Sequence, residues 1–161
     1  MNKLLRTLLI GTVLAVGGSA VAVAAAATSS LSGTWVLNLA KSKFNPGPGP
    51  KSQTRTYEET AEGTVLNFNG VAADGTTVSG HATFKYDGKD YAITGSPDYD
   101  ALSLKRVNGS TVKAKQKKAG KVVGTSVRTI SAHGKVLTLA SKGTDAKGAA
   151  YDNVMVFDKQ P

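Results

Sequence analysis

The chain has 161 residues, 40% of them hydrophobic, and a formal net charge of +9. A chain of that length makes one ordinary domain rather than several. It has no cysteine, which excludes a disulfide framework, a cysteine-linked lipid anchor and any site built on thiolates.

Residues 1–27 have the order of a secretory signal peptide. Lys3 and Arg6 precede an uncharged apolar run that ends in small residues, with Ala-x-Ala cleavage sites after Ala24 or Ala27. The run is also long enough for a membrane anchor, but glycines interrupt it and its tail is alanine rather than leucine. We expect cleavage, a periplasmic or secreted protein with no stable transmembrane segment, and one domain over residues 28–161.

The remaining domain is basic, because cleavage removes only two positive charges. Outside the cytoplasm, its expected neighbours are anionic envelope surfaces such as lipid head groups or acidic glycans. Solubility also accounts for such a charge. The segment 110–121 carries a candidate contact surface but no interleaved aromatic residues, so we expect no nucleic-acid partner. The candidate contact residues are Lys113, Lys115, Lys117, Lys118 and Lys121.

After residue 30 the sequence predicts an all-β domain. No segment keeps a helical apolar period for three turns, whereas short β-branched and aromatic runs alternate with glycine-bearing turns. Six such turns, among them Asp74-Gly75 and Asp87-Gly88, predict that consecutive strands pair antiparallel. The ten predicted strands are 33–40, 52–60, 64–71, 76–86, 89–95, 101–107, 110–118, 121–131, 135–142 and 150–159.

An antiparallel up-and-down β-barrel of about 8–10 strands is the architecture that best removes the exposed edges of such a sheet. The alternative is an open sandwich of two sheets. A membrane-spanning barrel is disfavoured, since three lysines share one face of 110–118 and the chain ends without an aromatic residue.

Alternation along each strand divides its residues between the interior and the outer surface. It turns His81 outward, places Trp35, Leu37 and Leu39 on one face, and groups Val122 with Arg128. Strands 121–131 and 150–159 are apolar on both faces, so their register stays ambiguous.

Several inward sets contain polar residues, and an inward arginine needs a carboxylate, an aromatic ring or an anionic ligand. One hypothesis is a cavity in which Arg106 or Arg128 receives the acid group of a small hydrophobic or amphipathic ligand. The alternative is a filled barrel in which each arginine caps a barrel end or stacks on Trp35. The candidate ligand-binding residues are Trp35, Tyr57, Phe68, Phe84, Tyr91, Arg106, Arg128, Tyr151 and Met155.

Gly33-x-Trp35 at the start of the first strand, the successive hairpins and a late arginine resemble the lipocalin and fatty-acid-binding (calycin) superfamily. The resemblance implies a barrel over about residues 31–159, with Trp35 closing one end and Arg128 packed across it. The lipocalin Thr-Asp-Tyr motif is reduced here to Asp98-Tyr99, and neither the C-terminal helix nor a helical lid is present. The chain also resembles uncharacterised exported bacterial lipocalin-like proteins that share "GTW…NLAKSKF…PGP.P" and "KYDGKDY..TG.PD", from which no activity follows.

No arrangement of residues predicts an enzyme, a cofactor or a metal site. His81 is predicted outward and His133 lies in a hairpin, so neither has a visible catalytic partner. Asp98 and Asp100 could at most bind a metal weakly, and turn chemistry explains the Asp-Gly pairs. Two functions remain: a ligand-binding barrel, or a filled barrel that contacts an anionic envelope surface through its lysines.

Overall fold

The computed structural model describes residues 30–161, and the predicted signal peptide, residues 1–27, lies outside them. The described chain is all-β, with one short 3-10 helix, η1 (Leu39–Lys41). Within these residues, no helix is long and apolar enough to cross a membrane. The strands are β1 (Gly33–Leu37), β2 (Ser52–Glu59), β3 (Thr64–Val71), β4 (Thr77–Phe84), β5 (Asp87–Ala92), β6 (Ala101–Arg106), β7 (Thr111–Lys118), β8 (Lys121–Ile130), β9 (Val136–Thr144) and β10 (Ala150–Lys159).

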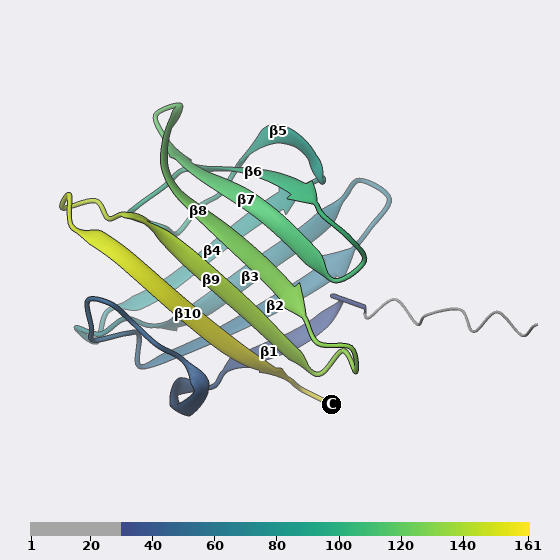
Figure 1. Cartoon of the computed structure of the whole chain (residues 1–161), viewed down its shortest axis with the longest axis horizontal. Coiled ribbons are helices and arrows are strands. Elements are labelled where there is room, and N and C mark those ends of the chain that lie inside the picture. Colours follow the sequence, from purple (N-terminus) through teal and green to yellow (C-terminus); the bar gives the residue numbers. More distant parts are fainter. Residues whose placement is uncertain (1–29) are drawn as a thin grey trace, which may run out of the picture.

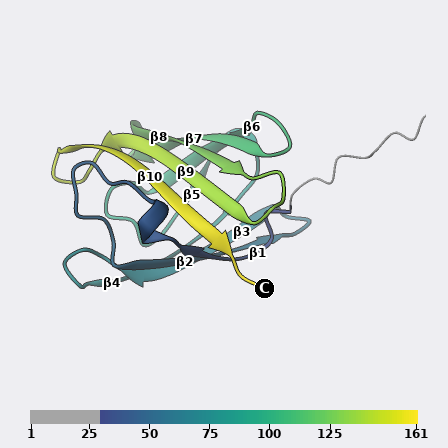
Figure 2. The ribbon, with the colours of Figure 1, turned by 60° about the horizontal axis from the view of Figure 1, so that its bottom comes forward.

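All ten strands form a single antiparallel sheet that curls into a nearly closed barrel (Figures 1 and 2). The strand order is β4-β3-β2-β1-β10-β9-β8-β7-β6-β5. The first strand, β1, therefore pairs with the last strand, β10, as well as with β2. The ten predicted strands and the barrel are therefore confirmed, and the two-sheet sandwich is not found.

The seam of the barrel lies between β4 and β5. The two strands are not paired with each other. An isolated bridge joins Ala82 of β4 to Ile93, the residue after β5, and the Thr94 N–H donates to the His81 carbonyl at 2.9 Å. The predicted hairpin at Asp87-Gly88 is wrong. Both residues belong to β5, whose pairing with β6 shifts register between Asp87 and Asp90, so they do not form a turn back onto β4.

Large apolar side chains fill one end of the barrel, which we call the base. Trp35, Phe84, Leu137 and Phe157 are fully buried there. The Trp35 indole N–H donates to the Leu31 carbonyl at 2.8 Å, so the segment before β1 closes the base. The opposite end, the mouth, is bordered by the loops 72–76, 93–100, 119–120 and 145–149, and its interior side chains are more polar.

The structure resolves the ambiguous registers. In β10, Tyr151, Asn153, Met155 and Phe157 face the interior. In β8, Arg128 faces inward and is 8% exposed. Val122, which was grouped with it, is 53% exposed, because a register shift after Gln116 interrupts the alternation.

Two further expectations are wrong. Leu39 is exposed because β1 ends at Leu37 and the chain turns into η1. Arg128 does not pack across Trp35. The cation over the indole is Lys159, whose Nζ lies 5.2 Å from the ring, because β10 places Lys159 opposite Trp35.

Candidate functional site

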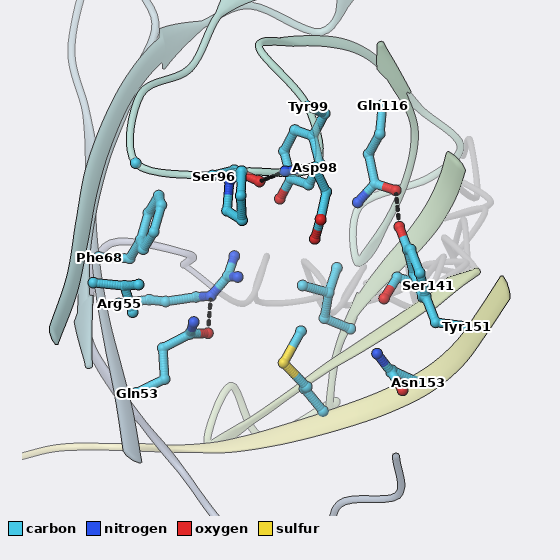
Figure 3. Close-up of a pocket in the computed structure, with 15 residues that line it drawn as sticks. Gln53, Arg55, Phe68, Ser96, Asp98, Tyr99, Gln116, Ser141, Tyr151 and Asn153 are labelled. Carbon is cyan, nitrogen blue, oxygen red and sulfur yellow. Dashed lines mark hydrogen bonds between the residues drawn. The ribbon is translucent and has the colours of Figure 1, made fainter. Parts of the chain in front are cut away.

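The candidate site is a cavity of about 210 Å³ at the mouth, which we call the mouth cavity (Figure 3). A smaller space of about 50 Å³, the inner cavity, lies deeper in the barrel and shares five lining residues with it. Amides, hydroxyls and one carboxyl group alternate with apolar side chains in the lining. The residues of the mouth cavity used below are Gln53, Arg55, Phe68, Asp98, Tyr99, Gln116, Leu139, Ser141, Tyr151, Asn153 and Met155.

Arg55 places a positive charge at the floor of the mouth cavity. It stands on β2, where strand alternation points it inward with its neighbours Gln53 and Tyr57, and it is only 9% exposed. Its Nε donates to Gln53 Oε1 at 2.9 Å and its Nη1 to the Tyr57 hydroxyl at 3.4 Å. The guanidinium also lies 5.7 Å from the ring centre of Phe68 and 5.3 Å from that of Phe157. Neutral groups therefore hold it in place.

No carboxylate of the described residues lies within 4.0 Å of this guanidinium. Every Asp and Glu of the sequence belongs to the described part, so the chain supplies no close counter-ion for Arg55. Within residues 30–161, no fully buried side-chain nitrogen or oxygen lacks a hydrogen-bond partner. Arg55 Nη2 has no protein partner among the observed bonds, so it must reach the open space of the cavity. A buried, unpaired guanidinium that faces a cavity is a binding element for an anion.

The wall opposite Arg55 presents a second polar pair, seen at the right of Figure 3. The Tyr151 hydroxyl donates to Gln116 Oε1 at 2.8 Å. Gly124 and Gly143 pair across β8 and β9, and a Cβ at either position would lie within about 3.0 Å of the Tyr151 hydroxyl. These two glycines therefore make the room in which the pair sits.

The loop 93–100 covers part of the mouth. Asp98 Oδ1 accepts the Ala146 N–H at 2.9 Å, which ties this loop to the loop 145–149. Asp100 is also used structurally, since its Oδ2 accepts the Ala119 N–H at 3.1 Å. In the part of the chain that the structure describes, no three His, Asp or Glu side chains gather to hold a metal ion.

Tyr57 links the mouth cavity to the deeper barrel. Its hydroxyl faces Arg55, and the Arg128 guanidinium lies 5.3 Å from its ring centre. Burial alone would raise the pKa of Tyr57, but the charges and hydrogen bonds of the two arginines outweigh burial and hold it below its usual value. Burial raises the pKa of Tyr99, and that of Tyr151 to about 12.

We expect Tyr57 to ionise before Tyr99 and Tyr151 in an alkaline titration followed by tyrosinate absorbance. The pKa of Tyr57 in the folded state lies below its value of about 10 in the unfolded state. At a pH between these two pKa values, Tyr57 is more protonated in the unfolded state than in the folded state. The contribution of Tyr57 to stability therefore rises with pH across that interval. The variant Tyr57→Phe should lose the early step and keep the late ones. If the early ionisation step is unchanged in Tyr57→Phe, the two arginines do not lower the pKa of Tyr57.

The predicted ligand-binding residues divide among different places. Tyr57 and Phe84 line the inner cavity, Tyr151 and Met155 line the mouth cavity, and Phe68 lines both. Two of the predicted aromatic residues line neither cavity. Trp35 is sealed in the base core, and Tyr91 donates its hydroxyl to Asp87 Oδ2 at 2.9 Å beside the barrel seam.

The predicted arginines are not those of the mouth cavity. Arg106 lies at the base, and Arg128 lies between the inner cavity and the base. Arg55 was not among the predicted ligand-binding residues, although it lies two residues before Tyr57 on β2 and therefore on the same face.

The predicted lysine surface lies on the outer face of β7 and the turn into β8. Lys113, Lys115, Lys118 and Lys121 are exposed and lie in no ion pair with any described residue. Lys117 is partly buried and pairs with Asp90 at 2.7 Å, so it belongs to the surface only in part.

No protein-family model matches this sequence. No curated protein sequence shows a significant match to it either.

Proposed function

We propose that this protein is an exported barrel that binds one small organic anion in its mouth cavity. The observation that carries the proposal is the buried guanidinium of Arg55, which has an open face toward the cavity and no close carboxylate. Gln53, Ser141 and Asn153 supply further hydrogen-bonding groups, while Phe68, Leu139 and Met155 supply apolar surface. The proposal retains the kinship with the lipocalin and fatty-acid-binding superfamily, supported by Gly33-x-Trp35 and the barrel.

The size of the cavity limits the ligand. A cavity of about 150 Å³ holds benzene, so about 210 Å³ accommodates roughly eight non-hydrogen atoms. The lining is too polar and the space too small for a long acyl chain to lie inside the barrel. A short organic acid with its own hydroxyl or amide groups fits better than a fatty acid.

The direct test is calorimetric titration with a panel of small carboxylates, each paired with its neutral amide. We expect at least one acid to bind, with an affinity at least tenfold above its neutral analogue, because the guanidinium bonds a charged group. The control Arg106→Gln removes an arginine outside this cavity and should bind the same acid unchanged. If no acid binds, or if neutral analogues bind equally well, the proposal fails.

The export part of the proposal rests on the signal-like order of residues 1–27. It is tested by N-terminal sequencing of the protein from the exported fraction. A new N-terminus at Ala25 or at Thr28 is the expected result. A chain that retains Met1 and stays in the cytoplasm contradicts it.

The exposed lysines favour a second candidate function, contact with an anionic envelope surface. The triple variant Lys113→Glu, Lys115→Glu, Lys118→Glu should then lose most binding to anionic vesicles. Wild-type binding should also weaken steeply as the screening length falls from about 30 Å at 0.01 M salt to about 8 Å at 0.15 M.

The matched control reverses three exposed lysines elsewhere: Lys43, Lys51 and Lys147. Equal losses in the two triple variants would show that only net charge matters, and this second function would be abandoned.

A further inference from the structure

A separate cavity of about 390 Å³ lies at the base of the barrel, at the opposite end from the mouth. We call it the base cavity. Its walls come from the segment before β1, the end of β2, Tyr86, the end of β6, and the turn between β6 and β7 with the parts of β7 and β8 beside it. Its volume falls within the range of about 300–1,000 Å³ that is common for small-molecule sites.

Two arginines from different strands meet around one tyrosine in this cavity. The guanidinium carbon of Arg106 lies 4.4 Å from the ring centre of Tyr86, and that of Arg128 lies 5.5 Å from it. Arg128 Nη2 also donates to the Tyr86 hydroxyl at 2.7 Å. The ring is itself held in place, because the Thr64 hydroxyl donates to its oxygen at 3.2 Å and Phe84 contacts it edge-on. The two cations are therefore positioned before any ligand arrives.

The cavity carries more positive than negative charge. Its one carboxylate is Glu59, whose Oε1 lies 3.9 Å from Arg106 Nη2, and both side chains are 45% exposed. Such a long, exposed pair is weak. Arg128 is 8% exposed, and no carboxylate of the described residues lies within 4.0 Å of it. Two guanidinium groups with one loosely held carboxylate leave a net positive charge.

We infer that the base cavity is a second anion site, in which Arg106 and Arg128 together bind one phosphate-type group. A guanidinium presents parallel N–H donors that match the oxygens of a phosphate, and two of them can share its double charge. Both guanidinium groups line this cavity and lie within 5.5 Å of the Tyr86 ring centre. This site is independent of the mouth cavity, so either can fail without the other.

The test is a phosphate titration at constant ionic strength, followed by the NMR signals of the arginine Nε–H groups. Inorganic phosphate should shift the signals of Arg106 and Arg128 in a saturable way and leave that of Arg55 unchanged. Arg106→Gln should weaken binding about tenfold or more, whereas the matched control Arg55→Gln should not. Arg106 is half exposed, so this variant should fold even if a change at Arg128 does not.

A variant that should bind phosphate more tightly tests whether Arg106 and Arg128 form a binding site or only stabilise the fold. Glu59→Gln removes the carboxylate that competes for Arg106 and should tighten phosphate binding several-fold. A structural pair would instead show no change in binding.

Two probes distinguish the sources of the phosphate group. Saturable binding of free phosphate supports a soluble phosphorylated ligand. Binding to phosphatidylglycerol vesicles but not to phosphatidylcholine vesicles, lost in Arg106→Gln, supports a lipid head group. If neither probe perturbs Arg106 and Arg128, or if Arg55→Gln abolishes the effect, the inference is overturned.

Discussion

Replacing Arg55 with methionine is expected to abolish anion binding in the mouth cavity while leaving the barrel folded. The lost charge-assisted hydrogen bonds should weaken binding by about a hundredfold or more. Stability should stay level or increase, because folding then no longer removes a guanidinium without a close carboxylate from water. The loss of ring contacts with Phe68 and Phe157 offsets part of that gain.

Two measurements on the same variant check this expectation. Calorimetric titration follows the affinity for the acid, and urea unfolding follows the free energy of unfolding. If Arg55→Met lowers that free energy by several kcal/mol, Arg55 is a structural residue that stacks on rings, and the mouth cavity loses its main binding element.

The largest loss of stability is expected from Trp35→Ala. Trp35 is fully buried in the base, and its indole N–H is bonded to the Leu31 carbonyl. Removing a buried aromatic side chain of this size costs about 3–5 kcal/mol, a large share of the total stability of a small domain.

The matched control is Val36→Ala, the next residue on the same strand. Val36 points outward and is 38% exposed, so its truncation should cost less than about 1 kcal/mol. Chemical denaturation of both variants gives the comparison. Similar losses at the two positions would contradict the assignment of Trp35 to the base core.

Much of the fold could be predicted because its signals are local. Alternation and glycine-bearing turns locate all ten strands, two of them, 64–71 and 150–159, with the observed bounds. The seam could not be predicted in this way. Asp87-Gly88 has the sequence of a hairpin turn, but it forms part of an irregular start to β5. Whether β4 and β5 pair depends on how the whole barrel closes, which no local pattern records.

The candidate site was predicted less well, because cavities arise from side chains that are distant in the sequence. Alternation groups residues by face, but strands 121–131 and 150–159 are apolar on both faces, so it did not settle that Arg128 and Met155 turn inward. It also gives no position along the barrel axis. Arg106 and Arg128 therefore fall toward the base, while Arg55, on the same face as Tyr57, reaches the mouth. The position of each arginine along its strand determines which cavity its side chain lines.

Native mass spectrometry of the protein, purified without detergent from the exported fraction, shows directly whether the mouth cavity holds a small acid. We expect a reproducible mass excess corresponding to a small acid, which disappears on organic extraction and is absent from Arg55→Met. A bare mass that stays bare after incubation with the acid panel would contradict it and leave a filled barrel, with its lysine surface as the remaining candidate.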